Sequence, residues 1–136
     1  MNEIPKEQDM AEDFRKLLKE ANRSDDWGRY FEDIVVQGFL VLSAQASSVH
    51  ASTPEETLED VNGYTAWQVA LSQNGKRTLT QKGYGAWDEL ARQPWATPFT
   101  PHEIDGIMEA EFVPTEVVQQ IYEDLLAWKK EPWTGD

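Results

Sequence analysis

Carboxylates are the most abundant side chains in this sequence that could do chemistry. The 136 residues include 25 Asp and Glu against 12 Lys and Arg, which gives a formal net charge of −13. Residues 31–75 contain six acids and no Lys or Arg, and residues 93–136 contain nine acids and two bases. Residues 76–92, between them, are basic. A charge imbalance of this kind carries information about binding partners and solubility, but it does not indicate the fold.

Two groups of acidic residues have no basic residue close by in the sequence. The first comprises Glu55, Glu56, Glu59 and Asp60, and the second comprises Glu103, Asp105, Glu109 and Glu111. In the first group the i,i+4 spacing would place like charges side by side on a helix. Each such pair destabilises an isolated helix by about 0.2–0.5 kcal/mol. One interpretation is a solvated face that promotes solubility. The other is a binding site, because a cationic partner would relieve the unbalanced charge.

No arrangement of residues in the sequence matches a catalytic or metal-binding motif. Residues 60–63 lack the alternating carboxylates and distal Glu of a calcium loop. Of the two histidines, His50 and His102, neither belongs to a zinc-protease pair. Cys is absent, which excludes disulfides and cysteine-ligated metals. We therefore predict no catalytic residues, no metal, no cofactor and no enzymatic activity.

The six tryptophans are candidates for core residues or binding anchors. Four of them lie in periodic segments and are predicted to be buried: Trp27, Trp67, Trp87 and Trp128. Trp95 and Trp133 lie in stretches that are flanked by Pro and lack periodicity. Since Trp is enriched among interface hot spots, these two are predicted as exposed anchors of a binding surface. The alternative is that they cover the core beneath loops.

Hydrophobic spacing and capping residues predict a mainly α protein of five or six helices. The expected helices cover residues 8–22, 24–47, 53–63, 84–92, 100–110 and 114–131. Thr53 followed by Pro54 is a typical helix start. For residues 34–42 a buried strand is the alternative, because this stretch is rich in β-branched side chains.

One small β-hairpin near residues 65–80 would change the class to α+β. Trp67, Val69 and Leu71 alternate with smaller or polar residues, and Asn74-Gly75 follows them. This pattern is typical of a strand and a tight turn. A helix over residues 64–73 is the competing interpretation.

Residues 1–136 are expected to form a single globular domain with frayed ends at 1–7 and 131–136. The longest apolar run, residues 34–42, is too short to cross a bilayer. The first residues lack the apolar stretch of a signal peptide. These observations predict a cytoplasmic protein with no membrane contact.

Residues 71–83 and the expected helix after them are similar to the wing and following helix of winged-helix regulators. The resemblance covers about the middle fifth of the chain, and it implies nucleic-acid binding through the basic residues 76–92. The region before it departs from that family, because residues 50–63 are acidic and would repel phosphate.

The function predicted from these features is a small acidic inhibitor, encoded by a phage or mobile element. It would dock on the basic nucleic-acid-binding surface of a defence protein, as anti-CRISPR and anti-restriction proteins do, without binding nucleic acid itself. Complementary charge would make such association fast and sensitive to salt. An immunity protein that neutralises a nuclease toxin would use the same physics and is the first alternative. A winged-helix-like transcriptional regulator is the second.

Overall fold

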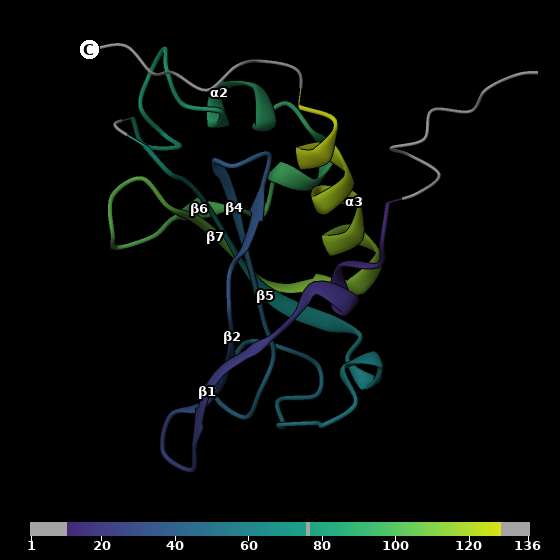
Figure 1. The fold of residues 1–136 in the computed structure, drawn as a ribbon. Coiled ribbons are helices and arrows are strands. Elements are labelled where there is room, and N and C mark those ends of the chain that lie inside the picture. Colours follow the sequence, from purple (N-terminus) through teal and green to yellow (C-terminus); the bar gives the residue numbers. More distant parts are fainter. Residues whose placement is uncertain (1–10, 76, 129–136) are drawn as a thin grey trace, which may run out of the picture.

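The chain folds into a five-stranded antiparallel sheet with a helix on one face, and a separate two-stranded hairpin (Figure 1). The computed structural model describes residues 11–75 and 77–128. The order in the main sheet is β3-β4-β5-β7-β6, with β3 (Ile34–Val36), β4 (Leu40–Gln45), β5 (Ala66–Gln73), β6 (Thr100–Pro101) and β7 (Met108–Pro114). The hairpin pairs β1 (Glu20–Ser24) with β2 (Gly28–Phe31). The helical elements are α2 (Trp87–Leu90), α3 (Thr115–Leu126) and the 3₁₀ turns η1 (Phe14–Leu17), η2 (Val61–Gly63) and η3 (Pro94–Ala96).

One face of the main sheet is apolar, because alternate residues along each strand point to the same side. Leu42 of β4 lies opposite Leu71 of β5. Val69 of β5 lies opposite Ala44 of β4 and Ala110 of β7. These five side chains are at most 3% exposed, so this face forms the centre of the core.

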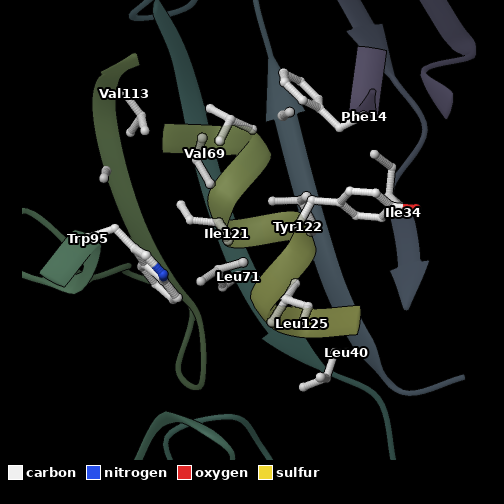
Figure 2. Close-up of a cluster of buried hydrophobic side chains, with 14 of the residues drawn as sticks. Phe14, Ile34, Leu40, Val69, Leu71, Trp95, Val113, Ile121, Tyr122 and Leu125 are labelled. Atoms are coloured by element: carbon white, nitrogen blue, oxygen red, sulfur yellow. The ribbon is translucent and has the colours of Figure 1, made fainter. Parts of the chain in front are cut away.

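Helix α3 covers the apolar face. Its buried residues, Val118, Ile121, Tyr122 and Leu125, recur at the spacing of one helical stripe. Figure 2 shows Ile121 and Leu125 among side chains from the sheet, including Leu71. The turn between β3 and β4 closes the end of the helix, since the side-chain amide of Gln37 lies 2.8 Å from the carbonyl oxygen of Leu125.

The predicted mainly α fold is wrong: the structure is mainly β, and α3 is its one helix of seven or more described residues. The expected helix over residues 24–47 is replaced by β2, β3 and β4. Gln37 and Gly38 have positive φ angles of 55° and 79°, and this turn reverses the chain between β3 and β4. The alternative for residues 34–42, one buried strand, is right about the extended conformation and wrong about the single strand, because the segment contains β3, a turn and the start of β4.

Three other expected helices are also absent, each because residues distant in the sequence hold the segment in place. Residues 8–22 contain η1 and β1, and the Phe14 amide donates to Gln119 of α3 over 2.8 Å. Residues 53–63 form an irregular loop with a cis peptide bond before Pro54. Residues 100–110 form β6 and the start of β7, which pairs with β5.

The predicted hairpin around Asn74-Gly75 is wrong as well. Strand β5 is real, but it lies in the middle of the sheet between β4 and β7. The described residues from 74 to 83 contain no strand, so residues 71–83 do not form a wing. The pairing partners of β5 lie about 30 and 40 residues away in the sequence, beyond the reach of local patterns.

Helices α2 and α3 lie within the ranges expected for helices at 84–92 and 114–131. The termini predicted to fray, 1–7 and 131–136, lie outside the described residues. The single-domain organisation stays a prediction.

Candidate functional site

The first acidic group lies in the loop between β4 and β5. Glu55, Glu56, Glu59 and Asp60 are all exposed there. Glu59 forms an ion pair with Arg23 of β1 at 2.6 Å, and this hydrogen-bonded guanidinium holds the pKa of Glu59 below its usual value. Asp60 accepts a hydrogen bond from the Asn62 amide at the start of η2. Glu55 and Glu56 form no ion pair with any residue of 11–75 and 77–128.

The turn of the β1–β2 hairpin adds two more carboxylates and an exposed tryptophan to this region. Asp25 and Asp26 are exposed, and Trp27 is 72% exposed, contrary to the core position predicted for it. The ion pair between Arg23 and Glu59 joins the hairpin to the loop. Figure 1 shows both at the same end of the molecule. We call this region the acidic end and define it as Asp25, Asp26, Trp27, Glu55, Glu56, Glu59 and Asp60.

A close approach fixes the hairpin against the chain after β4. Gly28 has a φ of 74°, and a Cβ atom there would lie 2.6 Å from a methyl carbon of Val49. Only glycine fits both the backbone conformation and the space. Trp27, Tyr30 and Val49 are 72%, 37% and 47% exposed, so the hairpin and the chain after β4 both present large apolar side chains to solvent.

Arg29 is the residue that holds the loop in place, a role that no local pattern around it indicates. It is 2% exposed, and its guanidinium donates to the carbonyls of Leu58 at 2.6 Å and Ala46 at 2.8 Å. It also donates to the Tyr64 hydroxyl at 3.0 Å and lies 4.4 Å from the centre of the Phe31 ring. One buried cation therefore binds this loop near its start, at Ala46, and near its end, at Tyr64.

Tyr64 completes this arrangement. Its hydroxyl accepts a hydrogen bond from the Leu58 amide at 2.7 Å and donates to the Glu56 carbonyl at 2.5 Å. Backbone groups that a helix would pair internally thus bind side chains instead, which explains why residues 53–63 do not form the expected helix. The same bonds position the exposed carboxylates of Glu55 and Glu56.

The second acidic group lies along β7 and the turn between β6 and β7. Glu103 and Asp105 are exposed on the turn, and Glu111 is exposed in β7. Glu109 is partly buried, and one of its carboxylate oxygens lies 3.1 Å from Nε2 of His102. This group forms no helix face, and it lies on different elements from the acidic end.

Glu109 and both histidines line a pocket on the face of the sheet that α3 leaves open. The pocket has a volume of about 450 Å³. Its polar lining residues are Tyr30, Asp33, Ser43, Gln45, His50, Gln68, His102 and Glu109, without any Lys or Arg. We call it the open-face pocket.

His50 is the most unusual residue of this pocket. It is 4% exposed, its Nδ1 lies 2.6 Å from the Ser47 hydroxyl, and its Nε2 has no hydrogen-bond partner among the described residues. Burial, with a contribution from the charge of Arg29, lowers the pKa of His50 to about 4. Partial burial also raises the pKa of Asp33, which lies on the rim.

Of the two tryptophans predicted as anchors, Trp95 is 7% exposed. Its indole N–H donates to Asp124 of α3 at 2.8 Å, and its ring packs against Trp87 and Phe99. Trp95 therefore covers the core beside α3 and plays no part in the acidic end. Trp133 lies outside the described residues.

Within residues 11–75 and 77–128, no three His, Asp or Glu side chains are arranged to hold a metal ion. The helices of this part of the chain are all too short or too polar to cross a membrane. Comparisons with protein-family models, curated proteins and solved structures find no match for the chain. Its class is therefore defined by the fold and the two surface features, a mainly β protein with an acidic end and a polar open-face pocket.

Proposed function

We propose that this protein is a small acidic inhibitor, encoded by a phage or mobile element, that docks on a basic nucleic-acid-binding surface of a defence protein in the cytoplasm. The observation that carries the proposal is the acidic end. There, Asp25, Asp26, Glu55 and Glu56 are exposed beside Trp27, which is 72% exposed.

The chemistry of this surface supports docking on a cationic groove. Large aromatic side chains supply much of the binding energy at protein interfaces, and Trp27 is available for such a contact. The surrounding carboxylates would accelerate encounter with a basic surface. They would also occupy positions that phosphates take when the same surface binds nucleic acid.

Contacts from neighbouring side chains hold the loop that carries Glu55, Glu56 and Glu59 in one conformation. The side chains of Arg29 and Tyr64 bind its backbone, and Arg23 links Glu59 to the hairpin. A surface preorganised in this way loses less conformational entropy when it binds. An immunity protein directed against a nuclease toxin would present the same surface and is the second candidate. A winged-helix regulator lacks support, because residues 71–83 form no wing.

The test compares two double variants that remove the same charge. Glu55→Gln with Glu56→Gln neutralises the acidic end, and Glu103→Gln with Asp105→Asn neutralises the exposed turn before β7. Each variant and the wild type are used to capture partners from host lysate over a salt gradient. Bound proteins are identified, and competition with duplex DNA is measured.

We expect the wild type to retain a basic nucleic-acid-binding protein that elutes as salt rises and that duplex DNA displaces. The Glu55 and Glu56 variant should release it at lower salt, whereas the matched variant should behave as the wild type. A defence effector would support the first candidate and a nuclease toxin the second. Recovery of DNA without protein, or equal behaviour of the two variants, would contradict the proposal.

A further inference from the structure

The open-face pocket contains a buried hydrogen-bonding group that nothing in the described protein satisfies. Nε2 of His50 has no partner, although the residue is 4% exposed. A buried polar atom left without a partner costs free energy, and such atoms are rare in folded proteins. The orphan nitrogen therefore points to a ligand.

The neighbours of His50 fix which ring nitrogen carries the proton. The Ser47 hydroxyl oxygen already accepts a hydrogen bond from the Val49 amide at 3.2 Å. The hydroxyl hydrogen can then be donated to Nδ1 of His50, 2.6 Å away. In this tautomer only the Nε2–H is unsatisfied, whereas the other tautomer would leave both the Ser47 hydrogen and the Nε2 lone pair without partners. His50 therefore offers a donor, and its ligand must supply an oxygen acceptor.

Gln68 supplies further donors in the same pocket. Its side-chain oxygen accepts a hydrogen bond from the Ala51 amide at 2.9 Å, which fixes the orientation of the amide group. The NH₂ group of Gln68 makes no hydrogen bond with the described residues, so it too can bind an oxygen acceptor.

The remaining polar groups select positive charge. Asp33 forms no ion pair with any residue in the described ranges, and Glu109 has one oxygen that His102 does not use. No Lys or Arg lines the pocket. A ligand that satisfies His50, Gln68 and Asp33 carries a cation with several N–H donors and, a short distance away, a carbonyl oxygen. An arginine residue of a polypeptide has both.

We propose that the open-face pocket binds one arginine residue of the partner protein, with the guanidinium at Asp33 and a main-chain carbonyl at His50 and Gln68. That the arginine belongs to a basic partner rests on the proposed function. The Tyr30 and His50 rings pack with their centres 4.5 Å apart, and Tyr30 is itself 37% exposed, so it is the neighbour that would move to admit a ligand to Nε2. The pocket volume of about 450 Å³ accommodates one residue of this size.

The test uses capped arginine, N-acetyl-arginine N-methylamide, as the probe, and the equivalent citrulline compound as its uncharged isostere. Both are titrated into the full-length protein while ¹H–¹⁵N spectra are recorded, including the side-chain NH₂ signals of Gln68. Two variants are compared: Asp33→Asn at the pocket, and Asp25→Asn, which makes the same change at the acidic end. Both positions are exposed, so both variants should fold.

We expect capped arginine to shift the Gln68 side-chain signals and to bind about tenfold more tightly than capped citrulline, because charge-assisted hydrogen bonds are the stronger ones. Asp33→Asn should weaken binding about fivefold, and Asp25→Asn should leave it unchanged. Equal binding of the two compounds, shifts confined to other regions, or equal behaviour of the two variants would overturn the inference. Failure here would leave the salt-dependent capture by the acidic end intact, so the two proposals fail separately.

Discussion

The two faces of the main sheet are made of the same strands and have opposite properties. On the face under α3, Leu42 and Leu71 are fully or almost fully buried. On the open face, Ser43 and Gln68 alternate with them and line a pocket. One face holds the fold together, whereas the other leaves polar groups free to bind. Because side chains alternate along a strand, a single set of strands can serve both purposes.

The largest effect should come from the covered face. Trp67 is 0% exposed, packs against Phe14 and Tyr64, and donates its indole N–H to Thr115 at the start of α3 over 3.0 Å. Trp67→Ala should lower the free energy of unfolding by about 3–5 kcal/mol, since it opens a cavity between sheet and helix. Urea denaturation followed by circular dichroism measures this loss.

A truncation on the other side of the sheet, Val35→Ala in β3, provides the comparison. Val35 is 50% exposed, so its truncation should change the free energy of unfolding by less than about 0.5 kcal/mol. If the two substitutions lowered the free energy of unfolding by similar amounts, the covered face would not be the one that stabilises the fold.

Arg29 tests whether a polar residue off the sheet can matter as much as the covered face. Arg29→Met keeps the side chain's apolar stem and leaves the carbonyls of Ala46 and Leu58 without their donor. The free energy of unfolding should fall by about 3 kcal/mol, because buried polar groups lose their partners. Hydrogen exchange should increase most in residues 46–64. Unchanged exchange there would mean that the loop is held by other contacts.

His50, on the open face, should make the free energy of unfolding depend on pH. The pKa of His50 falls from 6.5 to about 4 on folding. Between these values the unfolded chain binds a proton that the folded protein excludes, so stability is complete above pH 6.5 and is lost as pH falls towards 4. From pH 7.5 to pH 5 this contribution amounts to about 2 kcal/mol.

The control for this prediction is His50→Gln, which cannot titrate. Denaturation of both proteins at several pH values isolates the contribution of His50, since the other groups that face the pocket, Asp33, His102 and Glu109, are common to both. Parallel curves for the two proteins would show that His50 is not protected from protonation by folding.

The contrast between the faces also explains which parts of the fold could be predicted from the sequence. The alternation of Trp67, Val69 and Leu71 correctly indicated a strand, and the spacing in α3 correctly indicated a helix with one buried stripe. Both signals are local. The partners of β5 are distant in the sequence, so the local pattern after β5 predicts a hairpin that does not form.

The predictions for residues 53–63 and Trp27 failed for a related reason. Thr53 and Pro54 resemble a helix start, but Arg29 and Tyr64 bind the backbone of this loop from outside it. The hydrophobic spacing predicts a buried helix face for Trp27, which instead lies on a hairpin turn with a 72% exposed side chain. The acidic residues were found from charge alone, whereas the pocket required knowing that His50, Gln68 and Glu109 share one face.

Only a small effect on stability is expected at the acidic end, and this result separates binding from folding. Glu55 and Glu56 are exposed and form no ion pair with a described residue, so Glu55→Gln with Glu56→Gln should change the free energy of unfolding by less than about 0.5 kcal/mol. The direction should be towards greater stability, because self-repulsion in a protein of net charge −13 decreases.

Partner association should nevertheless become slower and less dependent on salt. Thermal unfolding and stopped-flow association at two salt concentrations measure the two quantities. A substantial loss of stability would show that these carboxylates support the loop, and the slower association could then no longer be assigned to the docking surface.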